Sequence, residues 1–176
     1  MLQLFVDRLT TLDFSYLHPD RGLLGESWLL DVTLGGDLDA QGMVLDFADV
    51  KRDIKELVDE AFDHRLLLPM QYSGLVEQTR RGMSHLNFET RDGAFIQHSS
   101  PEQAVCRIDA PEVTPEQVAA AIAGRLRPRL PDNVTSLEIR LRPEAIEGAF
   151  YHYSHGLKHH CGNCQRIAHG HRSRLV

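Results

Sequence analysis

The 176-residue sequence predicts an α+β fold, in which helices pack on one face of an antiparallel sheet. Two observations lead to this prediction. In several segments apolar residues alternate with polar ones, which is typical of half-buried strands. In two others apolar residues recur every three or four positions, which is typical of amphipathic helices. The predicted order is strand, strand, helix, hairpin, helix, strand, strand. With 42% hydrophobic residues, the chain can form one packed domain, or one domain and part of another.

The first half of the chain should supply two strands and a helix. Residues 3–16 are expected to form the first strand, although their period is not clean. Residues 27–34 form a clearer one, because four apolar side chains share a face: Trp28, Leu30, Val32 and Leu34. Gly35 and Gly36 end it. The helix that follows has an apolar stripe with helical spacing, formed by Phe47, Val50, Ile54, Leu57, Val58 and Ala61. Asp46 is expected to cap it.

The second half should supply a hairpin, another helix and two strands. Residues 84–97 alternate around a turn at Asp92 and Gly93. A helix should start at Thr114, because threonine is a good cap and Pro115 suits the first helical position. Pro128 should end it. Residues 134–141 alternate again, and residues 149–151 begin a last apolar strand.

Composition limits the function classes. The formal net charge of −6 argues against a broad nucleic-acid interface. No apolar run approaches the roughly 20 residues of a membrane span, and the first residues lack a signal-peptide profile. Three cysteines fit a reducing cytoplasm better than a disulfide scaffold. We therefore expect a cytoplasmic protein that binds neither nucleic acid nor membrane.

The C-terminal quarter suggests a metal site. Five histidines and two cysteines lie between Tyr153 and His171, and imidazole and thiolate are the ligands zinc prefers. Residues i and i+2 of a strand share a face, so His169 and His171 can point the same way. His155, which follows the apolar segment 149–151, is the best candidate for a third ligand from a neighbouring strand. Such a site leaves one position open for substrate.

Two other interpretations of this quarter stay open. Cys161 and Cys164, followed by His169, could form a closed structural zinc knuckle without chemistry. The histidines could also belong to a surface segment or an expression remnant. Their interleaving with Tyr, Leu, Cys and Ile argues against a remnant.

Four motifs together resemble the 6-pyruvoyl-tetrahydropterin synthase family, which includes bacterial 6-carboxytetrahydropterin synthase. Residues 43–51, with Asp46 and Phe47, are similar to the family's entry to its first helix. Residues 62–67 look like the Asp-His element that ends that helix. Residues 134–148 look like its closing strand, and residues 153–171 look like its zinc motif. The resemblance implies a T-fold, whose small sheets close into multimeric barrels with active sites between subunits. It therefore implies a homo-oligomer.

The resemblance also implies roles for single residues. His155, His169 and His171 would bind Zn²⁺, and Cys164, or alternatively Cys161, would be the general base. Asp63 and His64 would form a second acid/base element, although a histidine at a helix C-terminus can simply complement the helix dipole. Glu144, or alternatively Glu147, would anchor the pterin, although a lone glutamate on such a turn is more often a solvated surface residue.

The implied substrate is 7,8-dihydroneopterin triphosphate. The implied enzyme is a lyase of the 6-carboxytetrahydropterin synthase type, in deazapurine (queuosine) synthesis. A 6-pyruvoyl product is the alternative within the family. A non-catalytic T-fold paralogue that binds a pterin or scaffolds a multimer is a further alternative.

The motif order departs from the family pattern, in which the zinc motif comes first. At the expected N-terminal place, Leu24 and Glu26 stand where the zinc histidines should be. We therefore predict that residues 1–148 form one T-fold unit that lacks its N-terminal zinc ligands. Residues 149–176 would be the start of a second unit that carries the zinc motif. A circularly permuted single domain is the rival explanation.

Overall fold

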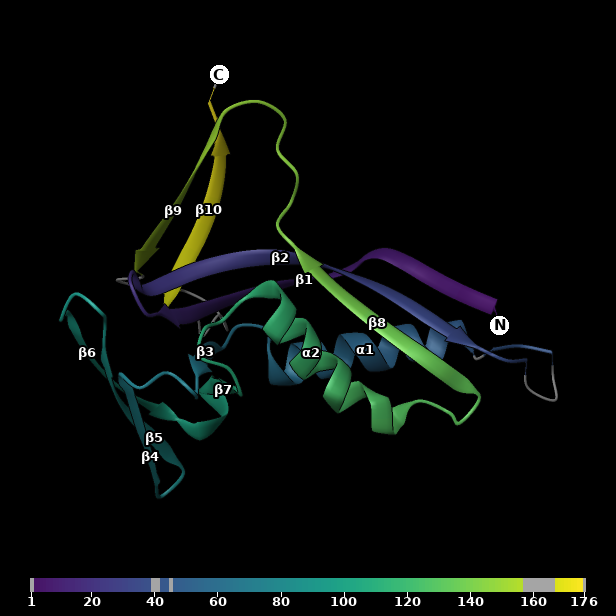
Figure 1. The fold of residues 1–176 in the computed structure, drawn as a ribbon, viewed down its shortest axis with the longest axis horizontal. Helices are drawn as coiled ribbons and strands as arrows, with labels where there is room; N and C mark the ends of the chain where they lie inside the picture. The colour runs from purple at the N-terminus through teal and green to yellow at the C-terminus, as the bar shows by residue number, and fades with distance from the viewer. Residues whose placement is uncertain (1, 39–41, 45, 157–166, 176) are drawn as a thin grey trace.

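The computed structural model describes residues 2–38, 42–44, 46–156 and 167–175. These residues form three sheets and two α-helices (Figure 1). The largest sheet has the strand order β7-β3-β1-β2-β8, and the two smaller ones are β4-β5-β6 and β9-β10. Figure 1 shows both helices on the same side of the long strands, which confirms the α+β fold class.

A long hairpin forms the centre of the large sheet. β1 (Leu2–His18) and β2 (Gly22–Gly36) pair antiparallel along almost their whole length, with a register shift between Val6 and Thr10. β8 (Val134–Arg142) pairs antiparallel with the outer edge of β2. The predicted strands at 3–16, 27–34 and 134–141 are thus confirmed within longer elements.

The other edge of this sheet is parallel, so the prediction of a wholly antiparallel sheet is wrong there. β3 (Leu66–Pro69) runs parallel to β1, and β7 (Val105–Ile108) runs parallel to β3. Parallel neighbours need a crossover connection, and the chain passes from β1 to β3 through β2 and α1 (Phe47–Ala61). The sequence did not reveal β3 because Leu66, Leu67 and Leu68 are all buried, which removes the alternation that marks a half-buried strand.

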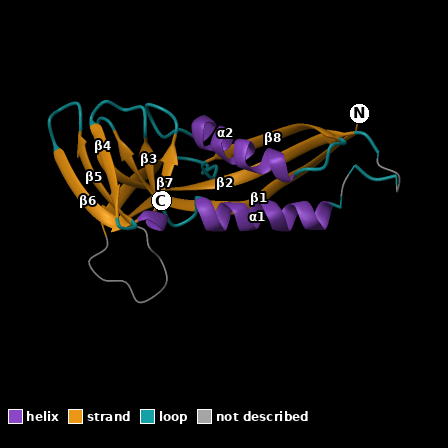
Figure 2. Cartoon of the chain, turned by 90° about the horizontal axis from the view of Figure 1, so that it is seen from below, coloured by secondary structure: helices purple, strands orange, loops and turns teal. Residues whose placement is uncertain are grey.

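Both helices begin where their caps predict. In α1 (Phe47–Ala61), the Asp46 carboxylate accepts hydrogen bonds from the N–H groups of Ala48 and Asp49. In α2 (Pro115–Leu126), the Thr114 hydroxyl accepts from the N–H of Gln117, and a 3-10 turn (Arg127–Arg129) replaces further helix at Pro128. The helices cover one face of the large sheet (Figure 2). Between them and the sheet lie fully buried side chains, including Phe14, Leu30, Ile54, Phe62 and Ile122.

A three-stranded meander is inserted between β3 and β7. It consists of β4 (Leu75–Arg80), β5 (Met83–Glu89) and β6 (Phe95–Pro101). The predicted hairpin with its turn at Gly93 is confirmed as β5 and β6, whereas β4 was not predicted. A second apolar cluster lies beneath the meander: Leu17, Leu66, Leu68, Leu86, Phe88 and Val105. The Arg107 guanidinium also joins β7 to Glu77 of β4 at 2.7 and 2.8 Å.

The C-terminal hairpin forms its own sheet and lies across the turn end of β1 and β2 (Figure 1). It consists of β9 (Phe150–Gly156) and β10 (Ala168–Arg174), paired antiparallel with His169 opposite His155. Reciprocal hydrogen bonds fasten it: the Ser15 hydroxyl bonds both the N–H and the carbonyl of Ala168, at 3.0 and 2.9 Å. The C-terminal motif is therefore attached to the first strand of the chain.

Candidate metal and substrate site

The three histidines expected to bind zinc lie together on the outward face of the β9-β10 sheet. His155 lies opposite His169, and the ring centroids of these two are 5.8 Å apart. The ring of His171 is 5.0 Å from that of His155 and 6.2 Å from that of His169. The Nε2 atoms of His155 and His171 face each other at 2.9 Å. The i, i+2 spacing thus brings His169 and His171 to the same side of β10, with the third imidazole on the paired strand, and metal binding by the three stays a prediction.

Imidazole nitrogen suits zinc, and two of these three rings already lie near the spacing that zinc needs. In the described residues, the group with three ligand atoms within 4.8 Å of one another is Asp13, Asp63 and His64, so His169 must move closer to His155 and His171 to complete a zinc site. Zinc binds imidazole nitrogen at about 2.0–2.1 Å in a tetrahedron, which places two ligand nitrogens about 3.4 Å apart. The His155 and His171 nitrogens therefore need to separate by only about 0.5 Å to accept an ion between them. His155 is exposed, whereas His169 and His171 are half-buried, so one side of the group is open to solvent.

Sequence reasoning missed an aromatic residue next to these histidines. The ring centroid of Tyr153 is 5.3 Å from that of His171 and 6.4 Å from that of His155. Tyr151 stacks on its other side at 5.2 Å. The available signal was the same two-residue period, because Tyr151, Tyr153 and His155 alternate along β9. Tyr153 therefore presents a partly exposed ring and hydroxyl beside the histidines.

A cavity of about 220 Å³ lies beside His171. Glu144, the expected pterin anchor, lines it from the segment after β8, together with Ile146. Glu144 and Glu147 are both exposed, but only Glu144 is among the lining residues. The first hairpin contributes Glu26 and Ser27, and β10 contributes Gly170 and Arg172. A carboxylate able to accept two N–H groups thus faces the same space as one of the histidines.

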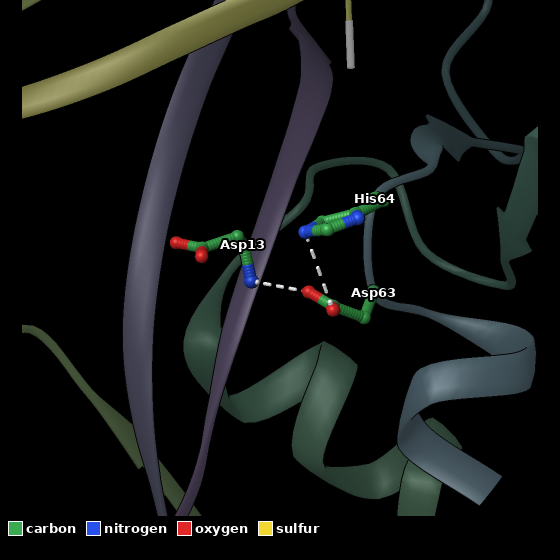
Figure 3. A group of neighbouring side chains, drawn as sticks. All are labelled: Asp13, Asp63 and His64. Atoms are coloured by element: carbon green, nitrogen blue, oxygen red, sulfur yellow. Dashed lines mark hydrogen bonds and ion pairs between the residues drawn. The ribbon is translucent and has the colours of Figure 1, made fainter. Parts of the chain in front are cut away.

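The other expected acid/base pair, Asp63 and His64, follows α1 (Figure 3). Asp63 Oδ2 lies 3.5 Å from His64 Nε2. Asp13 of β1 holds both residues through its backbone, since its N–H donates to Asp63 Oδ1 at 2.8 Å and its carbonyl accepts from the His64 N–H at 2.7 Å. His64 adopts a left-handed φ of 57°, which turns the chain from α1 into β3. Asp13 was not predicted, because a backbone contact across 50 residues leaves no local pattern.

The environment of Asp63 raises the pKa of its carboxyl above the ordinary value. Burial raises the pKa of this carboxyl, and the nearby Asp13 and Asp59 carboxylates raise it further. The Asp13 N–H and the His64 imidazole oppose these effects without overcoming them. One ligand atom each from Asp13, Asp63 and His64 lie within 4.8 Å of one another. Asp63 is mostly buried, whereas the His64 side chain is 44% exposed, so the pair can exchange a proton with a bound molecule.

The two groups are attached to the same stretch of β1. Asp13 holds the pair Asp63 and His64, and Ser15, two residues along, holds Ala168 next to His169. Cys161 and Cys164, the two candidate bases, lie outside the described residues.

Comparison with known proteins decides the family. The model of the family described as 6-pyruvoyl tetrahydropterin synthase matches residues 10–154, well over half of the chain. The chain belongs to the 6-pyruvoyl tetrahydropterin synthase family. The resemblance that the motifs indicated is therefore confirmed, and so is the fold that it implies. The match ends one residue before His155 and leaves His169 and His171 outside it.

Individual family members agree with this assignment. A putative 6-carboxy-5,6,7,8-tetrahydropterin synthase from Pyrococcus horikoshii is 23% identical over 136 residues, which cover 74% of either chain. Its counterpart from Pyrococcus abyssi is 25% identical over 130 residues, with the same coverage. The 6-pyruvoyltetrahydropterin synthase from Plasmodium vivax has a similar fold, with a TM-score of 0.63 and 19% identity. That alignment covers 80% of this chain and 90% of the Plasmodium chain. No helix in the described part of the chain is long and apolar enough to span a membrane.

Proposed function

We propose that this protein is a zinc-dependent pterin lyase of the 6-carboxytetrahydropterin synthase type, acting on 7,8-dihydroneopterin triphosphate in deazapurine (queuosine) synthesis. One observation carries the proposal: three imidazole rings lie 5.0 to 6.2 Å apart beside a cavity that Glu144 lines. The names of the Pyrococcus relatives favour the 6-carboxy product over the 6-pyruvoyl one, which remains the alternative within the family.

In this proposal His155, His169 and His171 hold the metal. Zinc would act there as a Lewis acid, which lowers the pKa of a hydroxyl or polarises a carbonyl that it contacts. Glu144 accepts hydrogen bonds from the N–H edge of the pterin and so fixes the ring in the cavity beside His171. Tyr153 limits the room beside His155 and His171 and thereby orients the substrate side chain.

We assign proton transfer to two groups: the pair of His64 and Asp63, and a cysteine of the C-terminal segment. His64 exchanges a proton at its exposed ring, while Asp63 orients that ring and is itself held by the Asp13 N–H. Cys164 is the proposed base from the C-terminal segment, with Cys161 as the alternative. A thiol beside imidazoles and a cation has a lowered pKa, which suits proton abstraction near neutral pH.

The domain assignment remains part of this proposal. Residues 1–148 would be a T-fold unit without its own zinc ligands, and residues 149–176 would begin a second unit. The family match over residues 10–154 and the replacement of the first unit's ligands by Leu24 and Glu26 support it. We further propose a cytoplasmic homo-oligomer that does not bind nucleic acid. The missing ligands of the first unit also favour a second candidate function, a non-catalytic pterin-binding or scaffolding paralogue.

Zinc stoichiometry and turnover test the proposal together. We expect about one zinc per chain in the wild type, and at least a tenfold loss of affinity in His155→Ala and His171→Ala. The matched control is His85→Ala, an exposed histidine of β5 whose ring bonds Ser99. Loss of zinc in Cys161→Ala or Cys164→Ala would instead establish the structural knuckle.

Incubation with 7,8-dihydroneopterin triphosphate then separates the remaining candidates. Chromatography of the product distinguishes the 6-carboxy from the 6-pyruvoyl compound. Zinc binding without any turnover would favour the non-catalytic paralogue. Normal turnover in both cysteine variants would remove the thiol mechanism.

A further inference from the structure

Glu26 is a buried carboxylate at the junction between the first hairpin and the C-terminal one. It lies in β2, two residues from Trp28, and is only 6% exposed. An ionised carboxylate at such a site is costly unless it is paired. In the described residues, its ion-pair partners come from the C-terminal hairpin. Arg172 of β10 donates from Nη2 to Glu26 Oε2 at 2.7 Å. His152 Nε2 of β9 lies 3.2 Å from Oε1, without the alignment of a hydrogen bond.

Because side chains alternate along a strand, the two faces of β10 have different surroundings. Ala168, Gly170 and Arg172 face the first hairpin, where they contact Ser15, Gly25 and Glu26 respectively. His169 and His171 lie between them in the sequence and therefore face outward. The same alternation holds in β9, where Ser154 bonds Gly25 on the inner side and His155 faces outward.

This junction is tight enough to fix the register of β10. A Cβ atom at Gly170 would overlap the Gly25 carbonyl, and a Cβ atom at Gly25 would lie 2.7 Å from His169 Cα. The crossing strands therefore touch backbone to backbone. Sliding β10 by one residue would exchange its two faces, bury the histidines and expose Arg172. The ion pair opposes such a slip, because the slip would leave Glu26 buried without its partner.

We propose that Glu26 is a positioning residue for the metal site: its ion pair with Arg172 holds β10 so that His169 and His171 face His155. The inference rests on the proposed metal-binding function and gives Glu26, which also lines the proposed substrate cavity, a role in holding the metal ligands. Arg172 is bonded to His171 in the chain, so the pair acts one residue away from a proposed ligand. The Leu24-Gly25-Glu26 segment, which lacks zinc ligands of its own, thereby supports the ligands of the C-terminal hairpin.

Zinc affinity and cobalt spectra test this role. We expect Glu26→Gln to weaken zinc binding by about 10- to 100-fold, as measured by competition with a chelator. With Co²⁺, the variant should show a weakened or shifted tetrahedral absorption band. Glu26→Asp should recover part of the affinity, because the charge is kept. Arg172→Gln, which removes the same pair from the β10 side, should give the same loss, and the double variant should be no weaker than the worse single one.

Asp31→Asn is the matched control. Asp31 lies on the same strand and is similarly buried, but its bonds run to Arg142 of β8 and to the Arg8 N–H of β1. Its loss should leave zinc affinity within about twofold of wild type. Wild-type zinc affinity and an unchanged cobalt spectrum in both Glu26→Gln and Arg172→Gln would overturn the role of Glu26 alone. A wild-type protein that binds no zinc would instead remove the proposed function, and this role with it.

Discussion

Replacing Gly170 by alanine should detach the C-terminal hairpin from the first one. The new Cβ would overlap the Gly25 carbonyl oxygen and lie 2.8 Å from the Glu26 nitrogen. Ordinary carbon contacts begin near 3.5 Å, and the overlap with the carbonyl oxygen is the closest contact, so β10 must withdraw from β2 by about 1.5 Å. Both neighbours are backbone atoms of a long paired strand, which cannot rotate away as a side chain would.

The cost follows from the bonds that cross this junction. Withdrawal stretches the bond from Gly25 N–H to Ser154 Oγ, now 3.1 Å, and that from Arg172 to Glu26, now 2.7 Å. A neutral hydrogen bond contributes about 1 kcal/mol net, and one to a charged group about 2 kcal/mol. The docked state should therefore lose about 3 kcal/mol, roughly a hundredfold in the docking equilibrium.

Hydrogen exchange of the peptide covering residues 168–174 measures this loss directly. We expect the amides of β10 in Gly170→Ala to exchange roughly a hundredfold faster than in wild type, while β1 and β2 stay protected. Zinc affinity should fall in the same variant. Wild-type exchange rates in β10 would refute the reasoning, since they would mean that the two backbones can separate at no cost.

Four further predictions concern other parts of the chain. Gly124→Ala, at an exposed position of α2 where an added Cβ meets nothing, should raise the free energy of unfolding by about 0.5–1 kcal/mol in urea denaturation. Asp63→Asn should raise that free energy at neutral pH and reduce turnover. Because burial raises the native pKa of Asp63, this gain should disappear as pH falls through that pKa into the ordinary carboxyl range. Asp31→Asn should lower the free energy of unfolding by about 1–2 kcal/mol at neutral pH. Burial alone would raise the pKa of Asp31, but Arg142 and the Arg8 N–H lower it on balance, so this loss should shrink as pH falls below the ordinary carboxyl range. Chelation of zinc should lower Tm in wild type and leave His171→Ala unchanged; equal shifts in both would contradict the proposed ligand.

Local sequence patterns predicted much of the fold. The alternation of Trp28, Leu30, Val32 and Leu34 gave the buried face of β2, and Asp46 and Thr114 marked both helix starts. The short strands β3, β4 and β7 were not predicted. The two strands of four residues, β3 and β7, are too short to establish a period, and β3 is buried along its whole length.

The candidate site, like the fold, was predicted from the sequence only in part. The two-residue spacing of His169 and His171 and the apolar segment before His155 indicated a group of three imidazoles, which the structure brings together. The contribution of Asp13 through its backbone was not visible, since a main-chain donor carries no residue signature. Tyr153 was overlooked although it has the same period as His155.

The sequence by itself determined which side chains share a face, where helices begin and which family the chain belongs to. These properties depend on periodicity, capping and motif spacing, all of which act over a few residues. Only the tertiary structure decided that β10 crosses β2 at Gly25 and that Glu26 pairs with Arg172, 146 residues away. Such contacts depend on the shapes of distant backbones and on the cost of burying a charge, and both arise only when the hairpins meet.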